Sequence, residues 1–143
     1  MVRAYSGCVP GACGRVLVVD DSQVIRQLIR VNLELDGFEV MTACDGAQCL
    51  EVAHLFRPDV ITLDLVMPRL DGLRTVDRLR LDPRTWHVPL VVVSASVGGE
   101  RELPEGIDAV VAKPFEPAEL VMLVRRLCEE GRSGVVQLAK RLA

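Results

Sequence analysis

Three carboxylates stand at the ends of two apolar runs in this chain. Asp20 and Asp21 end the run 15–21, and Asp64 ends the run 59–64. If both runs are parallel strands of one sheet, the three side chains meet at its carboxyl edge. Carboxylates this close stay ionised together only with a cation among them. Oxygen ligands of this kind suit Mg²⁺, which needs one or two protein carboxylates and a phosphate.

A hydroxyl and an amine end two further apolar runs. Ser94 lies near the end of the run 88–95, and Lys113 follows the run 108–112. Lysine offers a mobile positive charge to a phosphoryl oxygen, and serine offers a hydrogen-bond donor. Together with the acids, these groups are the set that phosphoryl transfer requires.

Each of these residues, taken singly, has a commoner structural role. An aspartate after a strand usually caps the next helix, as we expect for Asp45. A lone Lys-Pro pair is usually a loop, and a serine after a strand is usually a turn residue. The coincidence of suitable groups at four strand ends is what favours chemistry. We expect His54 and His87, which lie outside these strand ends, to be surface or core residues.

The elements that would position these groups alternate between strands and helices. The apolar runs predict five strands, at 15–21, 38–43, 59–64, 88–95 and 108–112. Helical periodicity predicts helices after Ser22, after Asp45 to about Phe56, from about Leu73 to Leu81, and from about Pro117 to Glu130. Four apolar residues carry the first of these patterns: Val24, Leu28, Val31 and Leu35. The alternation predicts an α/β fold, a doubly wound parallel sheet covered on both faces.

Several motifs resemble the receiver domain of bacterial two-component response regulators. They are VLVVDDS at 16–22, DLVMPRLDG at 64–72, VVVSA at 91–95 and AKPF at 112–115. The resemblance covers about residues 15–130. It implies a flavodoxin-like fold, with five strands in the order 2-1-3-4-5.

The resemblance also implies roles for the acids. Asp64 would be the phosphoacceptor. Asp21, Asp64 and the backbone carbonyl of Val66 would bind Mg²⁺ directly, and Asp20 would assist through a water molecule. The phosphoryl donor would be a phosphohistidine on a sensor histidine kinase or phosphotransfer protein.

Two further residues receive roles in the same way. Ser94 and Lys113 would contact the phosphoryl oxygens, and the Lys113–Pro114 peptide bond would be cis. The chain would then catalyse only its own phosphorylation and dephosphorylation, and it would act on no external substrate as an enzyme does. It would signal by a phosphorylation-dependent interaction with a downstream protein that the sequence does not identify.

Length and charge limit the other functions. The chain has 143 residues and a net charge of −3, and no basic stripe dominates, so we expect no direct nucleic-acid binding. It has neither an apolar run of about 20 residues nor a secretory signal, so we expect a cytoplasmic protein away from the membrane. We expect a flexible leader at 1–14, the receiver at 15–130 and a short, possibly helical tail at 131–143. At this length the receiver would stand alone, without an output domain.

Three other readings share parts of this pattern. A haloacid-dehalogenase-like phosphatase also uses an aspartate and Mg²⁺, but in an Asp-x-Asp pattern that the adjacent Asp20 and Asp21 do not match. A flavin carrier needs a Ser/Thr/Gly-rich phosphate loop, and two acids there would repel a phosphate. A pseudo-receiver would act only as an interaction module, and the intact acid set argues against it.

The output side of the domain departs from the resemblance. Receivers commonly carry Tyr or Phe three residues before the lysine, where this chain has Val110. Only 18 residues separate Ser94 from Lys113, and this stretch contains Gly98, Gly99 and Pro104. We therefore expect the fourth helix of the fold to be short, irregular or absent, with residues 95–106 acting as a loop that phosphorylation orders.

Overall fold

The computed structural model describes residues 13–64, 72–94 and 106–142. The strands are β1 (Arg15–Val19), β2 (Glu39–Ala43), β3 (Val60–Leu63), β4 (Leu90–Ser94) and β5 (Ala109–Ala112). The helices are α1 (Gln23–Leu35), α2 (Gly46–Phe56), α3 (Gly72–Leu81) and α4 (Pro117–Leu142). Each lies within a few residues of its predicted range, apart from the longer α4.

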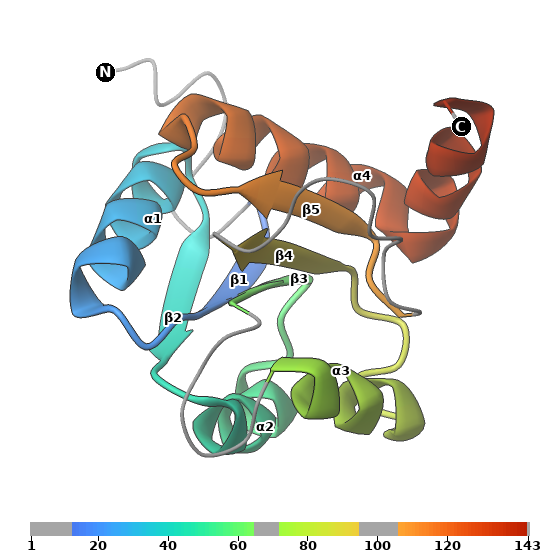
Figure 1. Cartoon of the computed structure of the whole chain (residues 1–143), viewed down its shortest axis with the longest axis horizontal. Helices are drawn as coiled ribbons and strands as arrows, with labels where there is room; N and C mark the ends of the chain where they lie inside the picture. The colour runs from blue at the N-terminus through green and yellow to red at the C-terminus, as the bar shows by residue number, and fades with distance from the viewer. Residues whose placement is uncertain (1–12, 65–71, 95–105, 143) are drawn as a thin grey trace.

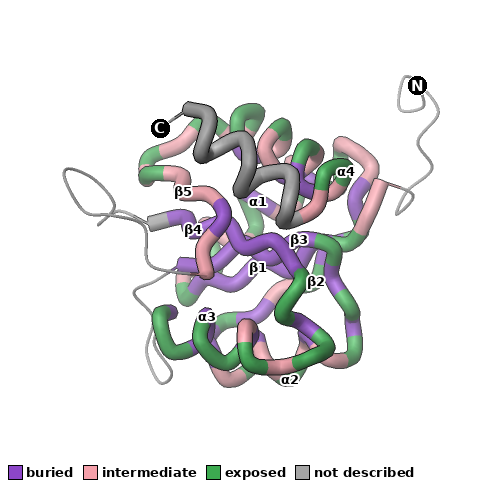
Figure 2. Tube along the Cα trace, turned by 90° about the vertical axis from the view of Figure 1, so that its right-hand side faces the viewer, coloured by how far each residue is buried: buried purple, intermediate pink, exposed green. Residues whose placement is uncertain are grey.

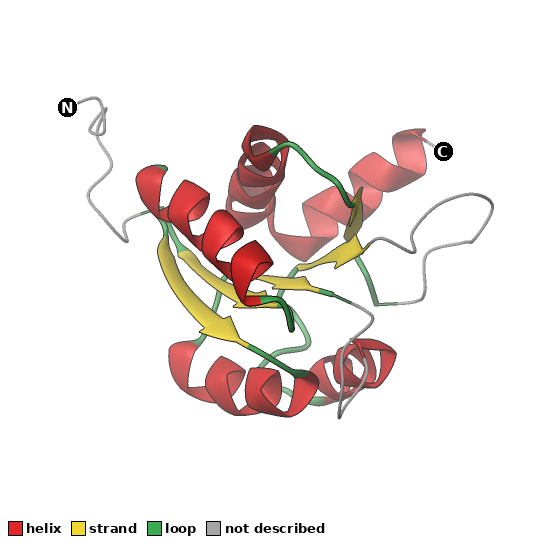
Figure 3. Cartoon of the chain, turned by 60° about the vertical axis from the view of Figure 1, so that its left-hand side comes forward, coloured by secondary structure: helices red, strands yellow, loops and turns green. Residues whose placement is uncertain are grey.

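The strands form one parallel sheet in the order β2-β1-β3-β4-β5. This confirms the predicted topology. Figure 1 shows the sheet as a central layer, with α1 and α4 on one face and α2 and α3 on the other. In chain order, α1 lies on the first face, α2 and α3 lie on the second, and α4 lies on the first again. Figure 3 shows the two helical layers from another side.

Two apolar clusters hold the layers together. One face of the sheet packs on α1 and α4 through Val16, Val18, Ile29, Leu33, Leu120, Val124 and Leu127. The other packs on α2 and α3 through Leu17, Val19, Cys49, Ala53, Ile61, Leu63, Val76 and Leu79. Successive strand residues point to opposite faces, so a run of valine and leucine supplies both clusters. Figure 2 shows β1, β3 and β4 buried along most of their length, whereas the edge strands β2 and β5 are partly exposed.

Helix α1 packs on the sheet through a different face from the apolar face that identified the helix in the sequence. The four residues Val24, Leu28, Val31 and Leu35 are exposed, by 76%, 40%, 49% and 73%. Ile29 and Leu33 face the core instead, and Ile25 packs beside them. The helix thus carries two apolar stripes, and periodicity locates the helix without deciding which stripe the sheet covers.

The predicted helix caps are present. Ser22 caps α1 by accepting the Ile25 N–H at 3.3 Å, and Asp45 caps α2 by accepting the Gln48 N–H at 2.8 Å. Gly131, with φ 72° and ψ −177°, interrupts α4 where the sequence predicted a break. Glycine adopts this conformation without the strain that a Cβ would cause. Beyond it the helix continues to Leu142, in agreement with a helical tail.

Some expectations fall on parts of the chain that the structure does not describe. Val66 lies outside the described residues, and so does nearly all of the stretch 95–106 where we expect a short or absent fourth helix. The same holds for the leader up to residue 12. Among the described helices, none combines the length and apolar character that crossing a membrane requires.

Candidate functional site

The sheet register brings the acids of two strands side by side. Val19 of β1 lies opposite Leu63 of β3. The next residues, Asp20 and Asp64, therefore lie side by side where the two strands end. The Asp64 N–H donates to the Val19 carbonyl at 3.0 Å and fixes this arrangement. One carboxylate oxygen from each of Asp20, Asp21 and Asp64 lies within 4.8 Å of the other two. The predicted acidic cluster is therefore formed.

Lys113 follows the edge strand β5, and its side chain reaches this cluster. Its Nζ lies 3.0 Å from Asp20 Oδ2 and 3.1 Å from Asp64 Oδ2. Burial lowers the lysine pKa, but the hydrogen bonds to Asp20 and Asp64 outweigh burial, and the pKa is raised overall. The ammonium therefore stays charged at neutral pH and bridges the two acids. The Lys113–Pro114 bond is cis, as the resemblance implies.

Asp20, one of the two buried acids of the cluster, carries an uncompensated cost of burial. Asp20 is 1% exposed, and desolvation raises its pKa despite hydrogen bonds from Ser22 and Lys113. The folded state then holds this proton more tightly than the unfolded chain, so stability falls as pH rises through the raised pKa. A cation beside the carboxylate would offset this cost. The donor set and its charge thus fit the divalent ion that the sequence predicts.

The two adjacent aspartates have different surroundings. Asp20 Oδ1 accepts the Ser22 N–H at 2.9 Å, and Oδ2 accepts Lys113 Nζ. Asp21 is exposed. An exposed carboxylate is free to turn toward a cation, whereas the oxygens of Asp20 already hold hydrogen bonds. That Asp21 binds the metal directly and Asp20 through water stays a prediction.

The other predicted residues are placed only in part. Ser94 is the last residue of β4 and pairs with Ala112, so its backbone lies at the same edge of the sheet as Lys113. Its side chain is outside the part of the structure that is described, as is the whole of Val66. His54 was expected to be a surface or core residue, and it is half-buried with its Nε2 2.7 Å from Asp82 Oδ2.

One contact at the site was not anticipated. Arg26 of α1 donates from Nη1 to the backbone carbonyl of Asp20 at 2.6 Å. The sequence carried a signal for it, because an arginine near the N-terminus of a helix opposes the helix dipole. Such a residue usually has a partner that compensates.

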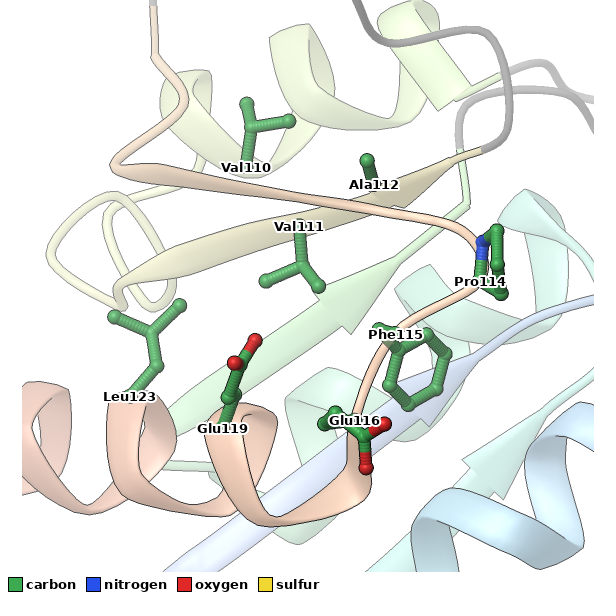
Figure 4. A pocket seen from close by; sticks show the side chains of 8 residues that line it. All are labelled: Val110, Val111, Ala112, Pro114, Phe115, Glu116, Glu119 and Leu123. Carbon is green, nitrogen blue, oxygen red and sulfur yellow. The ribbon is translucent and has the colours of Figure 1, made fainter.

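A cavity of about 510 Å³ lies beside the site, between β5 and α4 (Figure 4). Val111 points from β5 toward α4, where Leu123 and Glu119 lie, while Val110 points the other way. The lining also includes Pro114 and Phe115, which follow Lys113 directly. Residues that line the cavity are thus neighbours in sequence of Lys113, which contacts the acidic site.

Comparisons with known proteins agree with this geometry. The family model described as response regulator receiver domain matches residues 16–125. The chain is 44% identical over 116 residues to the transcriptional regulatory protein PrrA of Mycobacterium tuberculosis, covering 79% of this chain and 49% of PrrA. It is 36% identical over 117 residues to the DNA-binding dual master transcriptional regulator RpaA of Synechocystis sp., covering 79% of this chain and 48% of RpaA. The chain thus spans about half the length of these two relatives.

Solved structures show the same architecture. The chemotaxis response regulator CheY4 of Vibrio cholerae superposes with a TM-score of 0.70 at 32% identity, covering 79% of this chain and 97% of CheY4. The receiver domain of the sensor histidine kinase PA1611 from Pseudomonas aeruginosa superposes with a TM-score of 0.75 at 31% identity, covering 81% of this chain and 98% of that one. That structure holds a magnesium ion coordinated in its active-site cleft. The chain belongs to the response regulator receiver domain family.

Proposed function

We propose that this domain accepts a phosphoryl group on Asp64 and thereby relays a signal between two proteins. The observation that carries the proposal is the cluster of Asp20, Asp21 and Asp64, bridged by Lys113 at 3.0 and 3.1 Å. Receiver domains as a family bind Mg²⁺ at such an acidic site and are phosphorylated by sensor histidine kinases or phosphotransfer proteins. Labelling by a small acyl phosphate, described in the Discussion, tests the assignment.

The residues of the site have separate roles in the proposed phosphoryl transfer. Asp21, Asp64 and the Val66 carbonyl would hold Mg²⁺, with Asp20 acting through water, and the ion would offset charge on the phosphoryl oxygens. An Asp64 oxygen forms a bond to phosphorus as the bond from phosphorus to the donor imidazole breaks. The imidazole nitrogen keeps the electron pair and takes up a proton. Lys113 exchanges a carboxylate contact for a phosphoryl oxygen.

The phosphorylated state ends by hydrolysis. Water attacks phosphorus, the bond to the Asp64 oxygen breaks, and inorganic phosphate leaves with the carboxylate restored. The only reactions are therefore those of the domain's own aspartate, and we expect no turnover of an external substrate. We propose that both reactions take place in the cytoplasm and that a protein partner reads the phosphorylated state.

The exposed stripe of α1 is suited to docking the phosphodonor. The stripe is formed by Val24, Leu28, Val31 and Leu35, spaced by four, three and four residues. This is the spacing with which one helix packs along another. Because α1 begins directly after Asp21 and Ser22, the Val24 end of the stripe is the end closest to the acidic cluster. We therefore propose a donor whose phosphohistidine is carried on a helix.

Substituting Val24, the stripe residue closest to the site, should separate docking from chemistry. Val24→Ser should slow phosphorylation by a cognate donor about tenfold, because burying an exposed valine supplies about 1.5 kcal/mol. Phosphorylation by acetyl phosphate should be unchanged, since this small donor needs no docking helix. Both rates can be measured by intact mass.

Leu55→Ser is the matched control, because Leu55 is 86% exposed on α2. It should leave both rates unchanged. Equal slowing by the two variants, or slowing of the acetyl phosphate reaction by Val24→Ser, would contradict docking on α1.

Mg²⁺ should stabilise the unphosphorylated domain through the acidic cluster. At ten times its Kd the ion should add about 1.4 kcal/mol to the free energy of unfolding and raise Tm. Asp21→Ala should abolish the rise, since it removes the exposed carboxylate. Asp77→Ala, which removes an exposed acid of α3, should keep it. A wild-type Tm that is the same in Mg²⁺ and in a chelator would argue against the metal site.

A further inference from the structure

Arg26 fixes the peptide group that joins the two aspartates of the site. Its Nη1 lies 2.6 Å from the Asp20 carbonyl oxygen, which belongs to the Asp20–Asp21 peptide. Because a peptide group is planar, holding its oxygen also sets the direction of the Asp21 N–H and Cα. Arg26 therefore acts on Asp21 without touching its carboxylate.

The other polar groups of this turn are also held. The Asp20 N–H donates to the Ala43 carbonyl at 3.2 Å, and the Ser22 N–H donates to Asp20 Oδ1 at 2.9 Å. Asp21 thus lies between two fixed residues. The hydrogen bond from Arg26 is the one in this set that comes from a side chain of α1.

The position of Arg26 is unfavourable for α1 itself. The helix begins at Gln23, and Arg26 opens its second turn, with no acidic residue in the first turn to balance its charge. A cation at this end of a helix opposes the helix dipole. The Asp20 carbonyl supplies the compensating contact. A residue that breaks a local preference in this way commonly serves a site.

We infer that Arg26 is a positioning residue that orients Asp21 for Mg²⁺ binding. The inference rests on the proposed metal site and extends it to a residue outside the acidic cluster. Groups that orient a metal ligand commonly change metal affinity by tenfold or more when they are removed. Arg26→Met should therefore weaken Mg²⁺ binding about tenfold.

Electrostatics alone predicts the opposite sign. Removing a positive charge near three carboxylates should tighten the binding of a cation, because charge repulsion is relieved. Weaker binding in Arg26→Met thus identifies positioning and not charge. Arg26→Lys, which keeps both the charge and a donor, should recover part of the affinity.

The experiment is a Mg²⁺ titration by isothermal calorimetry on the whole chain, with Tm measured in chelator for each variant. Arg30→Met is the control, since it removes a partly exposed arginine one turn further along α1 that pairs with Glu34. It should bind Mg²⁺ within twofold of wild type. Arg26→Gln supplies the same comparison if Arg26→Met does not fold.

The outcomes distinguish a failure of the proposed metal site from a failure of the positioning role of Arg26. Wild type that binds no Mg²⁺ contradicts the proposed metal site. Wild type that binds, with a neutral Arg26 variant that binds equally or more tightly, overturns the positioning role alone. A lower Tm in chelator with unchanged Mg²⁺ affinity would assign Arg26 a purely structural role and would also overturn it.

Discussion

Arg80→Met should lower the free energy of unfolding by about 3–5 kcal/mol, the cost of removing one partner of a buried ion pair. Arg80 Nη2 lies 2.9 Å from Asp108 Oδ2, and the Asp108 side chain is 0% exposed. The substitution leaves that carboxylate in an apolar interior without its guanidinium. Methionine restores the bulk of the side chain but none of its donors.

The same guanidinium also satisfies backbone groups. It donates to the carbonyls of Gly106, Trp86 and Val88 at 2.9, 2.9 and 2.7 Å. Asp108 Oδ2 in turn accepts the Leu90 N–H at 2.9 Å. These contacts join the end of α3 to the starts of β4 and β5. Arg80 thus holds the starts of β4 and β5 in place, and Ser94 and Lys113 lie at the other ends of these two strands.

Urea unfolding of wild type and variant measures this loss. Arg78→Met is the matched control, because Arg78 is exposed on the same helix. It should change the free energy of unfolding by about 0.5 kcal/mol or less. Comparable losses from the two substitutions would show that helix α3, and not the Arg80–Asp108 pair, is the source of the effect.

The acidic site could be predicted because its residues follow strands that are apolar throughout. Asp20 and Asp64 each end such a run, and parallel strands bring their carboxyl ends to one edge. The sheet order then followed from the resemblance. The roles of Asp64, Ser94 and Lys113 stay predictions, since the structure gives their positions and not their chemistry.

The contacts of the arginines could not be predicted in the same way. Arg26 and Arg80 each donate to backbone carbonyls, in a turn or distant in sequence. Every residue has a backbone carbonyl, so the residue types do not reveal which one an arginine contacts. The exposure of the apolar stripe on α1 was not predicted, for another reason. The helix carries two apolar stripes, and only the packing of Ile29 and Leu33 against the sheet decides between them.

The proposed phosphorylation depends on Asp64. It is 6% exposed at the end of β3, within reach of Lys113 and of both other acids. Asp64→Asn keeps the shape of the side chain but replaces the nucleophilic carboxylate with a neutral amide. It should therefore abolish phosphorylation completely. Asp77→Asn, which changes an exposed acid in the same way, should have no effect.

The decisive measurement is the intact mass of the protein after incubation with acetyl phosphate and Mg²⁺. Wild type and Asp77→Asn should each gain the mass of one phosphoryl group, and a chelator should prevent the gain. Asp64→Asn should gain none. Labelling of Asp64→Asn equal to wild type would place the phosphoryl group elsewhere, and an unlabelled wild type would indicate a domain that acts only as an interaction module.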